Sequence, residues 1–227
     1  MAAPVVLVHG WGGSFATTWQ ASGFTELLKD VGREVVGIDL LGHGTAPKPH
    51  EPEAYAGLAD DLLARLPDEP VDAVGFSLGA MTLLRVAAEH PERFHRLVLA
   101  GIGKNVVDPD DDNAGERIAA AVEGTAPDSD THANVFAQYA HQPGNDPVAL
   151  AAIMRRPRSP MPAELLAGAT CPILVVIGDK DFAGPGEPLA SALPDARLIT
   201  LRNVDHFATP EAFGLWDAVL EFFDASL

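Results

Sequence analysis

The stretch Gly75-Phe76-Ser77-Leu78-Gly79 joins an apolar run to an amphipathic segment and decides the predicted fold. The run at 71–75 has the length of a buried strand, and the segment after it has the apolar spacing of a helix. Glycines on both sides of Ser77 permit a sharp strand-to-helix turn, which presents the serine oxygen at the carboxyl end of a sheet. A helix N-terminus behind that oxygen favours developing negative charge. We interpret Ser77 as a nucleophile; the alternative is a chance pattern in a chain with 21 glycines.

Short apolar runs alternate with longer amphipathic segments around this stretch. The expected strands are at 5–8, 34–38, 71–75, 97–99, 173–177 and 197–201. The expected helices are at 24–30, 52–65, 78–90, 189–193 and 210–223. Such alternation is typical of a parallel sheet with helices on both faces. The predicted fold class is α/β, with a mostly parallel, doubly wound sheet of about six strands.

Residues 102–168 interrupt this alternation and contain no convincing strand. Helical patterns occur near 114–122, 132–141 and 148–154. A structureless loop of this length is uncommon, so we expect a small helical cap at 102–168, inserted between core segments 1–101 and 169–227. The acidic stretch at 108–112 is interpreted as a solvated loop, with a calcium site as the alternative.

A second glycine-rich turn, His9-Gly10-Trp11-Gly12-Gly13, follows the first expected strand. Its glycines allow a backbone N–H to point into the space above the sheet, where it would form an oxyanion hole with the N–H of Leu78. Trp11 would supply the main-chain donor, and its indole would line the pocket. A tight turn with a hydrogen-bonded histidine is the alternative, but the place of this turn in the element order favours the oxyanion hole.

A serine hydroxyl needs a base within hydrogen-bonding reach, and His206 is the predicted base. Of the eight histidines, only His206 lies in the loop after the last expected strand, from which the chain can return to Ser77. His90 and His95 fall at the far end of the helix expected after Ser77, which points them away from the site. His43 and His50 follow the second expected strand, and we interpret them as pocket or surface residues. His132 and His141 belong to the predicted cap.

The base needs an acid to orient it, and three aspartates are candidates. Asp179 and Asp181 lie in the turn after the strand at 173–177, and Asp205 adjoins His206. Asp179 and Asp205 also have ordinary interpretations as turn-forming or capping residues.

Together these motifs resemble those of the α/β-hydrolase fold superfamily. They resemble most its small cap-bearing branch, which includes carboxylesterases, enol-lactonases, C–C bond hydrolases and cofactor-free haloperoxidases. The resemblance covers nearly the whole chain and rests on the stretches at 9–12, 39–44, 75–79, 178–181 and 205–207. The order serine, acid, histidine is the order of this superfamily. The sequence starts directly at the strand before His9, so the resemblance implies a sheet that lacks the usual first strands.

In members of this superfamily the acid is the last aspartate of the G-x-x-D turn and the base is the histidine of the final loop, which fall on Asp181 and His206. The oxyanion donors fall on the backbone of Trp11 and Leu78. A serine nucleophile implies an acyl-enzyme on Ser77, rather than the haloalkane or epoxide chemistry of relatives that use aspartate. This chemistry requires no metal and no cofactor.

The expected function is a serine hydrolase that cleaves a small, largely apolar carboxylic ester or lactone. Trp11, Phe76, Leu78 and residues of the cap would form the pocket. Two alternatives stay open: a C–C bond hydrolase of a diketone-type substrate, which uses the same triad, and a catalytically silent ligand-binding protein on this scaffold.

Composition limits the partners. The 227 residues include 15 Lys and Arg against 32 Asp and Glu, a formal net charge of -17. Nucleic acids and anionic membranes are bound through Lys and Arg, so we expect only a small-molecule substrate and leave the oligomeric state open. Cys171 is the only cysteine, so no intramolecular disulfide forms. We recognise neither a signal peptide nor a membrane-spanning run and expect a cytoplasmic protein.

Overall fold

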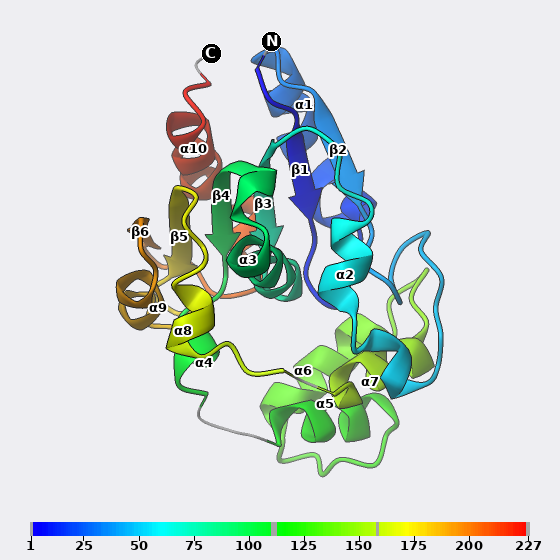
Figure 1. Ribbon diagram of the computed structural model, residues 1–227. Coiled ribbons are helices and arrows are strands. Elements are labelled where there is room, and N and C mark those ends of the chain that lie inside the picture. The colour runs from blue at the N-terminus through cyan, green and yellow to red at the C-terminus, as the bar shows by residue number, and fades with distance from the viewer. Residues whose placement is uncertain (1, 110–112, 158, 226–227) are drawn as a thin grey trace.

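The computed structural model describes residues 2–109, 113–157 and 159–225, and its centre is a six-stranded sheet (Figure 1). The strands are β1 Val5–Val8, β2 Val35–Ile38, β3 Val71–Phe76, β4 Phe94–Ala100, β5 Ile173–Gly178 and β6 Ala196–Leu201. Their order is β2-β1-β3-β4-β5-β6, and every neighbouring pair is parallel. Strands β1, β3 and β5 are buried along their whole length, as expected of parallel strands covered on both faces. The predicted fold class is confirmed.

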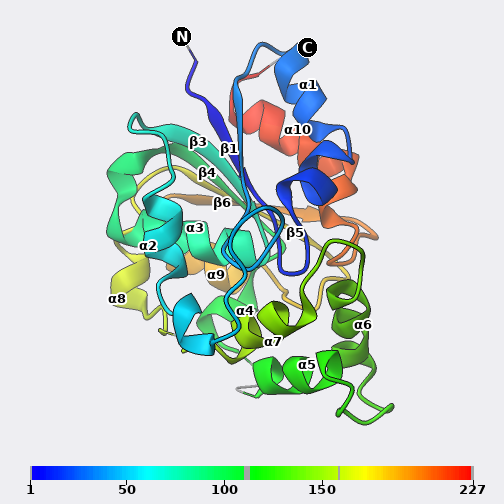
Figure 2. The same ribbon diagram turned by 90° about the vertical axis from the view of Figure 1, so that its right-hand side faces the viewer.

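Helices cover both faces of the sheet because side chains of each strand alternate in direction. On one face, Val5 and Leu7 pack with α1 (Phe24–Asp30), α10 (Phe213–Phe222) and the π-helix Phe15–Gln20. On the other face, Val6 and Val8 pack with α2 (Leu58–Leu63), α3 (Leu78–Glu89) and α9 (Glu187–Ala192). Figure 2 shows α1 and α10 on the side of the sheet opposite α2 and α3.

Five helices connect β4 to β5, and the described residues between these strands form no strand of their own. They are α4 Lys104–Val107, α5 Ala114–Val122, α6 Thr131–Ala140, α7 Pro147–Arg155 and α8 Ala163–Leu166. Helix α5 contacts both α6 and α7, and the three lie beyond the carboxyl ends of the strands (Figures 1 and 2). Of the predicted acidic loop, residues 110–112 lie outside the described residues.

Three local features differ from the expected helices. The helix expected at 52–65 is divided into a 3-10 helix, Pro52–Tyr55, and α2, with Gly57 immediately before α2. Glycine has low helix propensity and ends the first piece. The helix expected at 210–223 begins only at Phe213, because the extended backbone of Ala212 separates it from a 3-10 turn. The π-helix was not expected; it starts with a capping box between Ser14 and Thr17.

The helices of the described residues are short. None of them combines the length and apolar character needed to cross a lipid bilayer. The longest, α3, has 12 residues and packs against the sheet with nine of them buried. Its first residue follows Ser77 directly, so the packing of α3 fixes the position of the predicted nucleophile.

Candidate active site

Ser77 occupies a strained turn between β3 and α3. Its φ of 50° and ψ of -112° are rare for a residue with a side chain. A Cβ on Gly75 would lie 2.7 Å from the Cα of Ala80, and one on Gly79 would lie 2.5 Å from the carbonyl oxygen of His9. Both positions therefore require glycine for α3 to approach β3 and β1 closely. The strain presents the Ser77 hydroxyl at the carboxyl edge of the sheet.

A continuous hydrogen-bonded network links Ser77, His206 and Asp181. The Nε2 atom of His206 lies 3.0 Å from Ser77 Oγ, and Nδ1 lies 2.9 and 3.0 Å from the two carboxylate oxygens of Asp181. An ionised carboxylate only accepts hydrogen bonds, so Nδ1 carries the proton and Nε2 is left to accept the Ser77 hydroxyl. His206 is 4% exposed and Asp181 is 9% exposed. The acid end of the network is thus buried, whereas Ser77 and His206 line the cavity described below.

The three candidate acids have different partners in the structure. Asp181 contacts His206 and also accepts a 2.8 Å hydrogen bond from the backbone N–H of Ala183. The carboxylate of Asp205 accepts from the Ala208 N–H instead, and Asp179 is exposed to solvent. Only Asp181 among these three is hydrogen-bonded to the imidazole of His206.

Two phenylalanine rings enclose the imidazole of His206. The ring centroids of Phe76 and Phe182 lie 4.9 and 4.3 Å from that of His206. Phe182 follows Asp181 directly and is 48% exposed, so it covers the Asp181–His206 pair from the side of solvent. Phe182 belongs to no sequence motif described above, although its position next to the candidate acid Asp181 is a signal for a residue of the site.

The turn at residues 9–13 passes next to Ser77, since a Cβ on Gly10 would lie 3.3 Å from the Cβ of Ser77. Within the described residues, the backbone N–H groups of Trp11 and Leu78 donate no hydrogen bond. Both residues line the cavity that contains Ser77. Two unpaired N–H donors beside a nucleophile are the arrangement that binds an oxyanion.

His9 lies beneath this turn and is fully buried. Its Nε2 accepts the Leu40 N–H at 3.1 Å, so the neutral ring carries its proton on Nδ1, which donates to the Gly10 carbonyl at 2.7 Å. Burial lowers the pKa of His9 and keeps the ring neutral. The His9 side chain is therefore a fixed support of the turn.

The prediction that His43 is a pocket or surface residue is wrong, because its side chain is fully buried and lines neither of the two cavities described below. Its ring lies 4.9 Å from that of His9, and its Nδ1 atom lies 3.2 Å from the Leu41 carbonyl. Burial lowers the pKa of His43 to about 3. His50, by contrast, lies at the surface, 2.9 Å from a carboxylate oxygen of Asp146.

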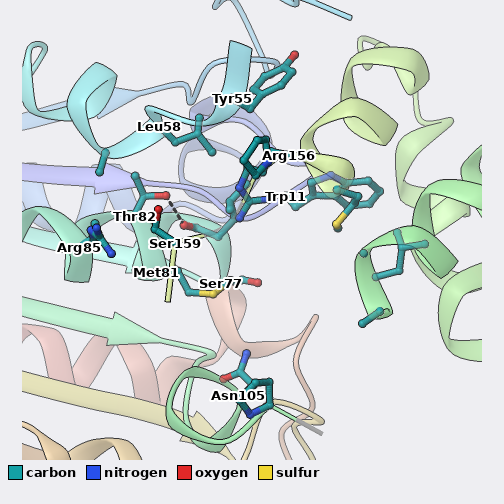
Figure 3. Close-up of a pocket in the computed structure, with 18 of the residues that line it drawn as sticks. Trp11, Tyr55, Leu58, Ser77, Met81, Thr82, Arg85, Asn105, Arg156 and Ser159 are labelled. Atoms are coloured by element: carbon teal, nitrogen blue, oxygen red, sulfur yellow. Dashed lines mark hydrogen bonds between the residues drawn. The ribbon is translucent and has the colours of Figure 1, made fainter. Parts of the chain in front are cut away.

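A cavity of about 720 Å³ opens beside Ser77 and His206 (Figure 3). Its apolar lining includes Trp11, Leu58, Leu78, Met81, Ile118, Phe136 and Met154. In Figure 3, Tyr55 and Leu58 lie on the opposite side of Ser77 from Asn105. The cavity thus lies between the carboxyl edge of the sheet and helices α5–α7. A smaller cavity of about 290 Å³ also reaches Ser77 and His206 and is lined by Phe76, Tyr139 and Phe207.

The large cavity is more polar than the sequence predicted. Arg85, Arg117 and Arg156 also line it. Arg85 forms an ion pair with Glu89 at 2.7 Å, and Arg117 forms one with Asp130 at 2.7 Å. Arg85 lies on α3, Arg117 on α5 and Arg156 just after α7, so no local motif brings them together. In the described part of the chain, no cluster of three or more His, Cys, Asp or Glu side chains is arranged to hold a metal ion.

Known proteins resemble this chain, some over most of its length and others over part of it. A pimeloyl-acyl-carrier protein methyl ester esterase of Neisseria meningitidis is 29% identical over 227 residues, which cover 89% of this chain and 85% of that protein. A 2-hydroxymuconate semialdehyde hydrolase of a Pseudomonas species is 35% identical over 104 residues, or 43% of this chain and 36% of that protein. The crystal structure of a hydrolase from Pseudomonas aeruginosa superposes with a TM-score of 0.73 at 25% identity, covering 99% of this chain and 91% of that one.

A family model described as the alpha/beta hydrolase fold matches residues 3–132. The matched residues include the turn at 9–13, the strained Ser77 and strands β1 to β4. They make up more than half of the chain, and the solved hydrolase shares the fold over nearly all of it. By its sequence and its structure, the chain belongs to the alpha/beta hydrolase fold family.

Proposed function

We propose that this protein is a serine hydrolase that cleaves carboxylic esters or lactones through an acyl-enzyme on Ser77. The observation that carries the proposal is the hydrogen-bonded chain Ser77–His206–Asp181, which ends at the wall of a 720 Å³ cavity. If the buried His206–Asp181 pair served only to stabilise the fold, it would need neither a strained serine nor an open cavity beside it. The esterase from Neisseria meningitidis supports the same reaction class.

In the proposed mechanism, His206 removes the proton of the Ser77 hydroxyl as its oxygen attacks the substrate carbonyl. The oxyanion of the tetrahedral intermediate accepts hydrogen bonds from the N–H groups of Trp11 and Leu78. Asp181 holds the imidazole in the tautomer that accepts this proton and stabilises the imidazolium. His206 then protonates the leaving alcohol, and water, activated by the same imidazole, releases the acyl group from Ser77.

The cavity supports a small, largely apolar acyl group as the substrate part held beside Ser77. Aromatic and aliphatic side chains from the sheet domain and from residues 102–168 surround it. We propose that residues 102–168 act as a cap, since α5, α6 and α7 each contribute to the lining. Ile118, Phe136 and Met154 are the corresponding side chains. Exchanging these side chains is expected to change the acyl-chain preference more than it changes the rate on the smallest ester.

A fluorophosphonate probe tests the proposal directly, because it reacts with an activated serine. We expect a single adduct on Ser77 of the folded protein and none in Ser77→Ala or His206→Ala. Hydrolysis of short-chain p-nitrophenyl esters is the companion assay. A wild-type protein that takes no label and turns over no ester would instead be a ligand-binding member of the family, and the proposal would be abandoned.

C–C bond hydrolysis is the second candidate, favoured by the partial match to the 2-hydroxymuconate semialdehyde hydrolase. It uses the same three side chains, so the network alone does not separate the two reactions. Comparing kcat/KM for p-nitrophenyl esters with that for a vinylogous diketone separates them. We expect the esters to be the better substrates.

A further inference from the structure

Asn145 connects the helical segment, residues 102–168, to the turn at residues 9–13, which carries the proposed oxyanion donor Trp11. It lies between α6 and α7, 133 residues along the chain from Gly12. Its Nδ2 atom donates to the Gly12 carbonyl at 2.8 Å and to the Tyr139 carbonyl at 2.9 Å. Because both partners are carbonyl oxygens, the amide nitrogen must face them, and both of its hydrogens are used.

The bond to Gly12 continues through two peptide groups toward Ser77. A trans peptide is planar, and its C=O and N–H point in opposite directions. The peptide whose carbonyl accepts from Asn145 carries the Gly13 N–H, which donates to the Gly10 carbonyl at 3.1 Å. The peptide of that second carbonyl carries the Trp11 N–H. The chain of hydrogen bonds therefore runs from Asn145 to Gly12, from Gly13 to Gly10, and ends on the Trp11 N–H.

Such a chain has two effects on its last donor. It fixes the planes of both peptides, and so the direction of the Trp11 N–H. It also polarises each peptide in turn, which makes the final N–H a stronger donor. The Gly10 carbonyl accepts a second hydrogen bond from His9, so the last peptide is held at its oxygen by two donors. Asn145, through the Gly12–Gly13 peptide, and the buried His9 thus both act on the Gly10–Trp11 peptide.

A second contact joins the same turn to the helical segment. The indole Nε1 of Trp11 donates to the Leu150 carbonyl in α7 at 3.1 Å, and its ring packs against Phe136 of α6 at 5.5 Å. Residues from 131–155 therefore hold two parts of the turn: the indole of Trp11 and the carbonyl of Gly12. Ser77, His206 and Asp181, all among the described residues, by contrast form no hydrogen bond with Asn145.

We propose that Asn145 is a positioning residue that aims and polarises the Trp11 N–H, so that the oxyanion hole is complete only when the helical segment is seated on the turn. The proposal rests on the proposed function, because it takes Trp11 as an oxyanion donor. It assigns to residues 102–168 a part in turnover in addition to the shape of the cavity. Asn145 itself touches neither substrate nor the reacting atoms.

Asn145→Asp is the sharpest test, because it keeps the size of the side chain and replaces the donor with an acceptor. Asn145→Ala is the second variant. Asn134→Asp is the matched control: Asn134 lies on α6, is similarly half-buried, and donates to the carbonyls of Pro127 and Asp128 at 3.2 and 3.4 Å. Rates with p-nitrophenyl esters, inhibition by a trifluoromethyl ketone and thermal unfolding are measured for all four proteins.

For both Asn145 variants we expect kcat to fall about 10-fold with little change in KM, since a small misplacement of a positioned group is costly. The inhibition constant of the ketone, which forms an oxyanion on the enzyme, should rise by the same factor. The Asn134 control should keep wild-type values. A merely structural Asn145 would lower the unfolding temperature without changing the ketone's inhibition constant relative to KM.

The outcomes separate the two proposals. Wild-type kcat and wild-type ketone inhibition in Asn145→Asp would overturn the role of Asn145 while the serine-hydrolase function stands. A wild-type protein that is neither labelled by fluorophosphonate nor active on any ester would overturn the proposed function and this inference with it.

Discussion

The two ends of the sheet each bury an acidic side chain against a basic one, and their surroundings differ. At the carboxyl end, Asp181 contacts His206, whose other nitrogen meets Ser77 at the wall of a cavity. At the amino end, Asp72 pairs with Arg33, whose guanidinium also donates to the carbonyls of Ala3 and Phe223.

The contrast shows that burial of an ion pair does not by itself indicate a functional site. The guanidinium of Arg33 contacts the backbone of Ala3 and Phe223 and lies 5.5 Å from the Phe223 ring centroid. It lines neither of the two cavities. The imidazole of His206 is directed at a strained hydroxyl with space for a ligand beside it. We therefore expect changes at the carboxyl end to remove activity without unfolding the protein, and changes at the amino end to do the reverse.

The largest expected effect is at the nucleophile. Ser77→Ala should lower kcat/KM for a p-nitrophenyl ester by about 10⁴-fold or more, because no other group of the network attacks the carbonyl. The unfolding temperature should stay close to that of the wild type, since the hydroxyl supports no packing. Initial rates and thermal unfolding are measured together. A variant with substantial remaining turnover would place the nucleophile elsewhere.

The next effect concerns the orienting acid. Asp181→Asn should lower kcat by about 10³-fold to 10⁴-fold, because an amide does not hold His206 in the required tautomer. Asp179→Asn is the matched control in the same turn; its side chain is exposed, and it should keep nearly full activity. The opposite order of the two variants would show that Asp179 is the acid.

At the amino end the effect should appear in stability. Arg33→Ala or Asp72→Ala leaves a buried charge without its partner, which should lower the free energy of unfolding by about 3–5 kcal/mol. The activity per folded molecule should be unchanged. Denaturant unfolding provides the measurement.

Two controls accompany that result. Lys29→Ala breaks a surface ion pair with Glu26 and should cost less than about 1 kcal/mol. The double variant Arg33→Met with Asp72→Leu should recover much of the loss, because no buried charge remains. A single variant at either buried position that is as stable as the wild type would contradict the assigned structural role.

A smaller, pH-dependent effect is expected from His43. Burial lowers its pKa to about 3, with the neighbouring His9 acting in the same direction, whereas an unfolded histidine titrates near 6.5. The unfolded chain therefore binds the proton first: stability is fully present above about pH 6.5 and is lost as the pH falls toward 3. Between pH 7.5 and 5.0 this side chain should account for a loss of about 2 kcal/mol in the free energy of unfolding.

Comparing denaturant unfolding at these two pH values in His43→Gln tests the assignment. The variant should be less stable at pH 7.5 but should lose less stability on acidification than the wild type. His50→Gln is the control at the surface and should keep the wild-type loss. An unchanged pH dependence in His43→Gln would contradict the assignment.

Much of this site follows from local sequence, and the remainder depends on contacts across the chain. The strands are short runs rich in Val, Ile and Leu, so their number and parallel arrangement were predictable, as was the strained turn at Ser77 between two required glycines. Local periodicity carries no information on how helices pack around a cavity. Arg156, Phe182 and Asn145 therefore received no role, and the burial of His43 beside His9 was missed.

The pairing of β4 with β5 affects how the substrate range of this protein can be redesigned. Strands β4 and β5 are hydrogen-bonded neighbours, so the chain leaves the sheet after one strand and returns on the adjacent one. The chain between β4 and β5 therefore begins and ends at adjacent strands, and we expect a replacement segment of different length to leave the strand registers unchanged. Under our proposal, a transplanted segment must also bring a donor to the Gly12 carbonyl. Selectivity and turnover would then be transferred as one module, and chimeras without that donor would bind new substrates but convert them slowly.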